Sequence, residues 1–298
     1  MRVGIHTSIA GSLERSALEA AELGANTFQI FSSSPRQWKA SVPGDASIKL
    51  LSRAREKHDL FPLVIHDNYL INLASADATI RAKSIDAFRG ELVRGIALDA
   101  EFLVAHPGNY KGQTVEQGIF AFLAGVAEAA NGLKFSKLML LVENTAGAGA
   151  QLGGRMEELH VMRDFAAQTV GQSSDLQIGF CLDTCHLLVS GYDISTEAGL
   201  NETVAEADRL LGMENVRVIH ANDSKGAFNS HLDRHQNIGE GYIGLEAFRR
   251  IVNHPKLRDK PFILETPVEK PGDDRKNVDT LKSLWRDETV MSAADKRR

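Results

Sequence analysis

The chain has 298 residues, of which 43% are hydrophobic, and this composition can build the core of one large α/β domain. The formal charge of −5 lacks the basic surplus that is usual in proteins that bind nucleic acid, although divalent cations held in a site would offset it. No apolar run approaches the roughly 18 residues of a membrane span, the first residues show no signal-peptide pattern, and there are only two cysteines. We therefore expect a cytoplasmic protein with no membrane partner.

Short apolar runs alternate with helix-length segments along the whole chain. Eight runs begin near residues 3, 27, 63, 102, 138, 178, 216 and 262, and segments with 3.6-residue periodicity cover residues 12–24, 77–99, 114–131 and 196–212. Ser12, Thr114 and Thr196 stand where helix N-caps belong, and Gly24 and Gly212 stand where helices should end. This alternation predicts a single-domain α/β fold, a (β/α)8 TIM barrel over residues 1–290, followed by a polar tail at residues 291–298.

Six of the apolar runs stop on a side chain that can bind a metal ion. These side chains are His66, His106, Glu143, Asp183, His220 and Glu265. In a parallel barrel the carboxyl ends of the strands meet at one mouth, where enzymes of this fold carry their active sites. Any one of these residues alone would ordinarily be a polar group in a hydrogen-bond network. Six together indicate a metal site, because buried His, Asp and Glu are costly without partners.

Three further candidate ligands lie in loops. His186 follows Asp183 by three residues, and Asp233 and His235 form a D-R-H sequence after the seventh run. Imidazole and carboxylate groups suit zinc, and nine ligands with one shared carboxylate would hold three zinc ions that each keep an open position. Two neighbouring metal ions recur in phosphoryl-transfer enzymes. His6 closes the first run, and its role stays open between a phosphate contact and a hydrogen-bond donor behind the ligands.

Two loops next to the expected mouth have the composition of substrate-contacting loops. Residues 32–40 include Arg36, and residues 66–75 place Tyr69 and Leu70 directly beyond His66. An aromatic ring and a leucine beside a metal site are unusual in solvent. Apolar side chains in such positions can insert between base pairs, as they do in DNA-bending proteins.

These motifs together resemble the endonuclease IV family of apurinic/apyrimidinic endonucleases over about residues 1–286. The resemblance is carried by HDNYLINLAS, AHPG, VENTAGAG, CLDTCHLLVSGYD, HANDSK, DRHQNIGEGYIG and ILETP. It implies that His66 and His106 bind a first zinc ion and that Glu143 bridges it to a second. The resemblance implies that the remaining ligands of the second ion are Asp183, His220 and Glu265. It implies a third ion held by His186, Asp233 and His235. It also implies that the residues that contact bent DNA are Arg36, Tyr69 and Leu70.

The activity implied by the resemblance is hydrolysis of the phosphodiester bond 5′ to an abasic site in duplex DNA. The products would be a 3′-hydroxyl and a 5′-deoxyribose phosphate, with Glu143 and Glu265 as catalytic residues and the chain acting as a monomer. One alternative is a divalent-metal sugar isomerase or epimerase on the same barrel, since fold alone does not decide function. Another is a non-catalytic protein that binds damaged DNA. Neither alternative needs three metal sites.

Overall fold

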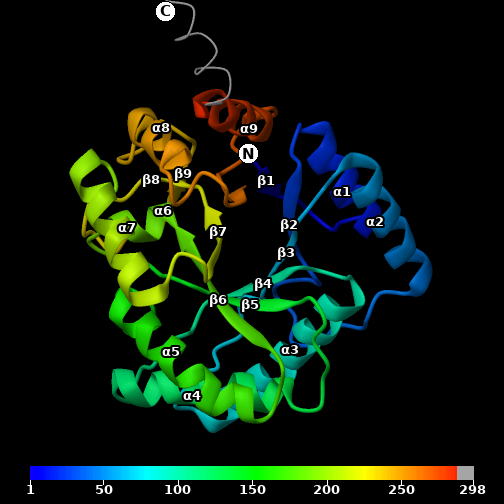
Figure 1. Ribbon diagram of the computed structural model, residues 1–298. Coiled ribbons are helices and arrows are strands. Elements are labelled where there is room, and N and C mark those ends of the chain that lie inside the picture. The colour runs from blue at the N-terminus through cyan, green and yellow to red at the C-terminus, as the bar shows by residue number, and fades with distance from the viewer. Residues whose placement is uncertain (287–298) are drawn as a thin grey trace, which may run out of the picture.

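The computed structural model describes residues 1–286, and within them eight parallel strands close into a barrel (Figure 1). The strands follow one another around the barrel in the order β1-β10-β7-β6-β5-β4-β3-β2. Their bounds are β1 Val3–His6, β2 Thr27–Phe31, β3 Leu63–His66, β4 Phe102–Ala105, β5 Met139–Glu143, β6 Gln177–Asp183, β7 Val216–His220 and β10 Phe262–Leu264. Each strand begins within one residue of its predicted start, so the predicted TIM barrel is confirmed.

A ring of helices surrounds the barrel. Their bounds are α1 Leu13–Glu22, α2 Asp45–His58, α3 Ala78–Ala97, α4 Val115–Ala130, α5 Met156–Thr169, α6 Thr184–Val189, α7 Glu197–Leu211, α8 Leu245–Asn253 and α9 Asp273–Leu284, with a 3-10 turn η1 at Val170–Gln172. The predicted N-caps Ser12, Thr114 and Thr196 all accept a backbone N–H with their side chains. Gly212 is the C-cap of α7, whereas Gly24 lies one residue beyond the C-cap of α1.

The barrel interior is filled by a layer of apolar side chains directly beneath the mouth. The layer consists of Val64, Val104, Leu141, Cys181, Val218 and Ile263, all fully buried. Each of these residues comes two positions before one of the six predicted strand-end ligands. Because side chains alternate faces along a strand, residues two apart point to the same side, so the six polar side chains lie inside the barrel above this layer.

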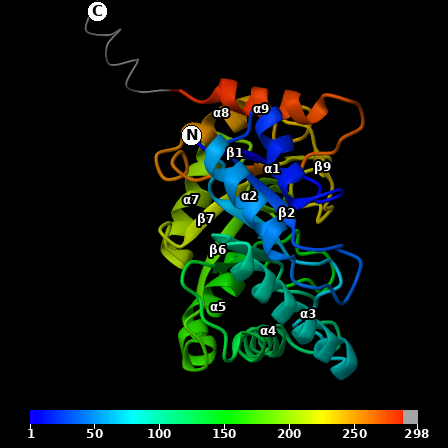
Figure 2. The ribbon, with the colours of Figure 1, turned by 90° about the vertical axis from the view of Figure 1, so that its right-hand side faces the viewer.

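The loops at the carboxyl ends of the strands form the mouth. The longest of them follows β7 and contains a two-stranded antiparallel hairpin made of β8 Asp223–Ser224 and β9 His235–Gln236. In the side view of Figure 2, β9 and the long loop after β2 lie on one side of the barrel and the N-terminus on the other. No helix in residues 1–286 is long and apolar enough to cross a membrane. The predicted domain end at residue 290 and the tail at residues 291–298 lie outside the described residues.

Candidate metal centre

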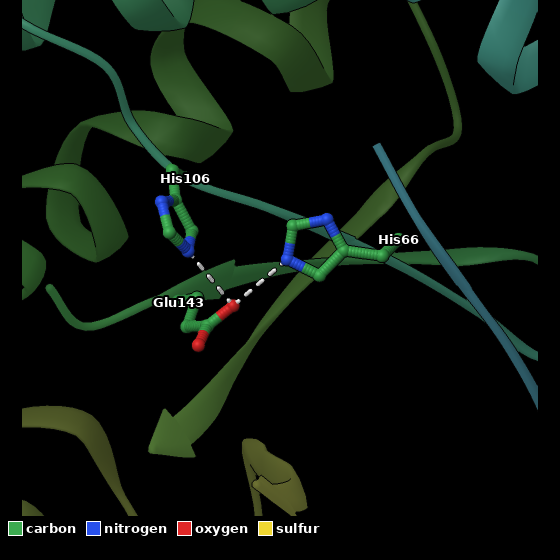
Figure 3. Close-up of side chains that lie close together, drawn as sticks. All are labelled: His66, His106 and Glu143. Atoms are coloured by element: carbon green, nitrogen blue, oxygen red, sulfur yellow. Dashed lines mark hydrogen bonds and ion pairs between the residues drawn. The ribbon is translucent and has the colours of Figure 1, made fainter. Parts of the chain in front are cut away.

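Glu143, the last residue of β5, lies at the centre of the mouth and is fully buried. Its Oε2 atom faces both His66 and His106 (Figure 3) and lies 3.3 Å from Nε2 of His66 and 3.2 Å from Nε2 of His106. Its Oε1 atom faces the opposite way and lies 3.0 Å from Nδ1 of His220 and 3.4 Å from Nδ1 of His186. The two oxygens of one carboxylate therefore serve two separate groups of imidazoles, which is the arrangement that a bridging ligand requires.

The candidate ligand atoms gather into overlapping groups whose members lie within 4.8 Å of one another. One group is His66, His106 and Glu143; a second is Glu143, Asp183, His220 and Glu265; a third is Asp183, His186 and His235; a fourth is Cys185, Asp233 and His235. Asp233 also lies 3.3 Å from Nε2 of His186. All nine residues singled out in the sequence thus meet at one mouth, although they come from widely separated parts of the chain.

The fourth group contains Cys185, which is not one of the nine candidate ligands. Without a metal ion, burial raises the pKa of its thiol to about 12. Only the thiolate is a good metal ligand. The thiol instead points toward the backbone oxygen of Arg234, 3.7 Å away. Cys185 therefore remains a weaker ligand candidate than its neighbour His186.

Several imidazoles are oriented from behind by backbone carbonyl groups. Nδ1 of His66 lies 3.0 Å from the backbone oxygen of Asp67, and Nδ1 of His186 lies 2.9 Å from that of Asn144. Nδ1 of His235 lies 3.1 Å from the backbone oxygen of Glu265. An Nδ1–H that donates to a carbonyl leaves the Nε2 lone pair directed toward the mouth.

Two of these Nε2 atoms provide a direct test of whether the site suits a metal ion. Nε2 of His186 and Nε2 of His235 are buried and have no hydrogen-bond partner among residues 1–286. Buried polar atoms without partners are rare in folded proteins and call for an explanation such as a bound ion. Both atoms face the Asp233 carboxylate, at 3.3 Å and 3.7 Å. This donor set fits a zinc ion.

The electrostatics of the mouth follow from its crowding. Burial by itself raises the pKa of Glu143 and Glu265, but His220 and the other imidazoles more than offset it and hold both values well below the usual range. Burial lowers the pKa of His66, yet Glu143, Glu265 and Asp67 outweigh it and raise the value to about 9. The carboxylates are therefore ionised at neutral pH, and positive charge stabilises them.

Sequence reasoning missed two amide side chains that hold the ligands in place. Gln29 of β2 is fully buried; its Oε1 accepts a hydrogen bond from Nε2 of His220 at 2.9 Å, and its Nε2 donates to Glu265 Oε1 at 2.6 Å. Asn222 donates from Nδ2 to Asp183 Oδ2 at 2.6 Å and accepts from the Glu265 backbone N–H at 2.7 Å. A glutamine within the apolar run FQIF was the signal for the first.

The open question about His6 is narrowed by the same network. Gln29 Nε2 lies 3.0 Å from Nδ1 of His6, and Nδ1 lies 3.8 Å from Glu265 Oε1. Burial lowers the pKa of His6, which favours the neutral ring and lets Nδ1 accept the amide hydrogen bond. His6 also lines the cavity of about 340 Å³ at the mouth. Its position behind Glu265 favours a hydrogen-bonding role.

Two of the three proposed DNA-contacting residues lie at the mouth: Tyr69 lines this cavity, and Tyr69 and Leu70 line a groove beside it. Tyr69 is 68% exposed, and its ring packs edge-on against Phe31 with centroids 5.1 Å apart. The Leu70 backbone N–H donates to Asn68 Oδ1 at 2.8 Å, and Asn68 Nδ2 donates to the Gln37 oxygen at 2.5 Å. Asn68 therefore ties the loop of Tyr69 and Leu70 to the loop that carries the exposed Arg36.

Comparison with known proteins agrees with this geometry. Residues 17–286 match the family described as Xylose isomerase-like TIM barrel. The chain is 62% identical to a "Probable endonuclease 4" of Solibacter usitatus, over 95% of this chain and 97% of that protein, and 39% identical to one of Halothermothrix orenii, over 96% and 100%. The solved endonuclease IV from Thermus thermophilus superposes with a TM-score of 0.82 at 36% identity, covering 95% of this chain and 98% of that one.

Sugar epimerases share the fold at much lower sequence similarity. A D-tagatose 3-epimerase-like protein superposes with a TM-score of 0.67 but is only 20% identical, over the full length of both chains. Such a likeness establishes the barrel and nothing about the reaction. With a relative 62% identical over nearly its whole length and all nine candidate ligands at one mouth, the chain belongs to the endonuclease IV family of xylose isomerase-like TIM barrels.

Proposed function

We propose that this protein is a zinc-dependent endonuclease that hydrolyses the phosphodiester bond 5′ to abasic sites in duplex DNA. The products are a 3′-hydroxyl and a 5′-deoxyribose phosphate. The observation that carries the proposal is the position of Glu143, whose Oε2 faces His66 and His106 and whose Oε1 faces His220. A carboxylate shared in this way supports a pair of neighbouring metal ions, an arrangement suited to phosphoryl transfer.

Three zinc ions account for the full donor set. His66, His106 and Glu143 would hold the first ion, and Glu143, Asp183, His220 and Glu265 the second, since these atoms lie within ligand reach of one another. His186, Asp233 and His235 would hold the third. Bound there, zinc supplies Lewis acidity toward the phosphate ester and toward the attacking water.

The two glutamates have different roles: Glu143 positions the imidazoles, and Glu265 orients the nucleophile. Glu143 is fully buried at the wall of the cavity, where its two oxygens fix the spacing of the imidazoles. Glu265 lines the cavity and is 18% exposed at its side chain. Gln29 holds its Oε1 atom, and Oε2 lies 3.3 Å from Nδ1 of His220. A carboxylate held at the cavity wall in this way can orient the attacking water.

Selectivity for an abasic nucleotide follows from the cost of extrusion and the shape of the rim. A nucleotide without a base leaves the helix cheaply, because no pairing must be broken for it. Tyr69 lines the cavity, Leu70 follows it in the same loop, and Arg36 is exposed on the neighbouring loop, so these side chains can fill the gap in the base stack. A sugar epimerase would need a closed small-molecule pocket and has no use for a 68% exposed tyrosine at its entrance.

The experiment that tests this function uses a duplex with a single tetrahydrofuran abasic analogue. Incubation with the purified protein should yield one nick directly 5′ to the analogue, detected by product sizing, and an undamaged duplex should stay intact. Glu143→Ala should abolish the nick. Glu265→Gln should still bind the duplex but cleave it very slowly. An uncut abasic duplex, or epimerisation of a ketose by the same preparation, would contradict the proposal.

We further propose that the protein acts as a monomer in the cytoplasm. A single chain supplies all nine candidate ligands, so the site needs no second subunit. Both cysteines are free and buried, which suits a reducing compartment. Light scattering after size-exclusion chromatography should give the mass of one 32.5 kDa chain.

A further inference from the structure

A second groove of about 290 Å³ lies beside the metal mouth and shares His66, Tyr69 and His106 with it. The loops that follow β3, β4 and β5 form its walls. Apart from the shared residues, its polar lining consists mostly of uncharged side chains, namely Asn68, Asn72, Asn109, Thr145 and Gln151. The one acidic residue in the lining, Asp67, is buried, and its Oδ1 lies 3.5 Å from His66 Nδ1.

Two amides in this groove stand side by side. Asn109 and Gln151 form an antiparallel bridge, flanked by hydrogen bonds from Tyr110 N to the Ala150 oxygen and from Leu152 N to the Gly108 oxygen, both 2.9 Å. Residues that lie directly opposite each other in an antiparallel pair project their side chains from the same face. Both side chains therefore reach the groove together, which agrees with their presence in its lining.

The orientation of each amide is set by a local hydrogen bond. Asn109 Oδ1 accepts from the Lys111 backbone N–H at 2.9 Å, and Gln151 Oε1 accepts from the Ala148 backbone N–H at 3.1 Å. The NH2 groups, Nδ2 of Asn109 and Nε2 of Gln151, have no protein partner in the described part of the chain. The groove thus presents two neighbouring neutral donors with nothing in the protein to receive them.

The backbone beneath these donors is rigid. The Asn72 amide pairs with both main-chain groups of Asn109, accepting from its N–H at 2.9 Å and donating to its oxygen at 3.1 Å. Gly108 has a φ of +98°, and a Cβ there would lie 2.3 Å from Asn72 Oδ1, so only glycine allows this close approach. A rigid pair of donors loses little entropy when it binds a ligand.

We propose that this groove binds a backbone phosphate next to the one that is cut, with the amide groups of Asn109 and Gln151 donating to its oxygens. The inference rests on the proposed function. Because the groove shares His66 and His106 with the metal mouth, a strand whose scissile phosphate sits at the metals passes Tyr69 and brings an adjacent phosphate to the amides. Asn and Gln side chains are common phosphate donors, and such contacts fix the register of the DNA.

The first arm of the test measures binding and cleavage by Asn109→Ala, Gln151→Ala and the double variant. Each single change should raise Kd for the tetrahydrofuran duplex about 2- to 10-fold, as expected for one hydrogen bond, with a smaller change in kcat. Because the donors are neutral, the slope of log Kd against log salt should match wild type. Asn201→Ala, an exposed amide change on α7, is the matched control and should change nothing.

The second arm identifies the phosphate by chemical substitution. A series of abasic duplexes carries one uncharged methylphosphonate at successive positions around the lesion. At one position next to the cut, the methylphosphonate should weaken binding by wild type. The double variant should bind this duplex as well as it binds the unsubstituted one, because its contact with that phosphate is already absent. Gln151→Glu, which places a carboxylate against the phosphate, should bind more weakly than Gln151→Ala on every duplex except that one.

The outcomes separate this inference from the function beneath it. Wild-type cleavage together with unchanged Kd in the double variant overturns the groove assignment and leaves the endonuclease intact. The groove assignment is also overturned if the affinity losses from the methylphosphonate and from the double substitution add at every position. It is overturned as well if the affinity loss in the variants depends on the identity of the neighbouring bases. A wild-type protein that neither binds nor cuts the abasic duplex overturns both the inference and the proposed function.

Discussion

At the scale of single residues, Gln29 connects three side chains of the candidate metal centre. It is fully buried and touches His220, Glu265 and His6 at once. A carbonyl oxygen that accepts from Nε2 of His220 leaves Nδ1 free to face Glu143 and a metal ion. Hydrogen-bond partners behind metal ligands are worth about 10- to 100-fold in metal affinity.

Gln29→Leu should therefore weaken metal binding about 10- to 100-fold and reduce cleavage in proportion. The physical reason is that His220 and Glu265 lose the group that sets their orientation. The measurement is competition for zinc against a chelator of known affinity, with Gln177→Leu, an exposed glutamine at the other end of the barrel, as the control. Wild-type zinc affinity in Gln29→Leu would show that the ligands orient themselves.

Tyr69 tests the insertion step at the level of one side chain. Its ring is 68% exposed and packs edge-on against Phe31, and it is none of the nine candidate ligands, so its removal should leave the metal content unchanged. Unstacking a base step costs a few kcal/mol, which contacts in the bent complex must offset. Tyr69→Ala should lower kcat/KM on a paired abasic duplex at unchanged metal content. On a duplex already opened by mismatches the loss should shrink; an equal loss on both would mean that Tyr69 supports the loop fold instead.

Tyr192 provides a pH prediction away from the metal centre. Its Oη accepts a hydrogen bond from the Met156 backbone N–H at 2.8 Å, and burial raises its pKa to about 12. In the unfolded chain the Tyr192 hydroxyl ionises near pH 10, so the folded state binds this proton more tightly. The contribution of protonated Tyr192 to the free energy of unfolding is therefore complete below about pH 10 and is lost as the pH rises toward 12.

Tyr192→Phe should cost about 1 kcal/mol of unfolding free energy at pH 8, because Met156 N–H loses its acceptor. Between pH 10 and pH 11 the gap between variant and wild type should narrow, since wild type alone loses the tyrosine contribution there. Urea unfolding at the three pH values measures this, with Tyr242→Phe, 63% exposed, as the control. A gap that widens with pH would contradict the sign of the pKa shift.

At the scale of elements, the loop after β7 is organised by one buried carboxylate. Asp223 accepts backbone hydrogen bonds from Ser224 and Ile243 at Oδ1 and from Gly239, Gly241 and Gly244 at Oδ2, at 2.8 to 3.3 Å. The same loop carries Asp233 and His235. Its conformation, and with it part of the proposed third site, thus depends on a residue outside the cavity lining.

Asp223→Asn should destabilise the fold by at least about 2 kcal/mol, because an amide NH2 would face backbone donors in place of an acceptor. It should also lower the metal content by about one ion per chain while the pair around Glu143 persists. Thermal unfolding and elemental analysis measure the two effects, and Asp86→Asn, an exposed carboxylate on α3, is the control. If the variant keeps its full metal content, the third site does not depend on the hydrogen bonds of Asp223.

At the scale of the whole molecule, the mouth concentrates buried carboxylates whose charge requires compensation. Prolonged chelation should abolish cleavage and lower the melting temperature, because a ligand bound only by the folded state stabilises it. Differential scanning calorimetry before and after chelation, and again after zinc addition, measures the change. Elemental analysis that finds one metal ion or fewer in a fully active chain would refute the three-zinc proposal.

The sequence by itself determined the barrel and the positions of the ligands along it. Strand and helix periods are local properties, so eight strand starts and the caps Ser12, Thr114 and Thr196 were predictable from neighbouring residues. Alternation also fixed which residues share a face. Each interior apolar residue, such as Leu141, stands two positions before a ligand, such as Glu143. A polar residue at the end of such a strand can only point into the mouth.

Only the tertiary structure decided which atoms meet. The barrel closes through strand registers that depend on contacts between distant segments, and these place Gln29 of β2 against His220 of β7 and Glu265 beyond β10. The same is true of Asn109 and Gln151, which stand side by side because two loops pair. Neither partner carries a local signal of the other. Their distances are set by the summed packing of the whole barrel, which no window of neighbouring residues contains.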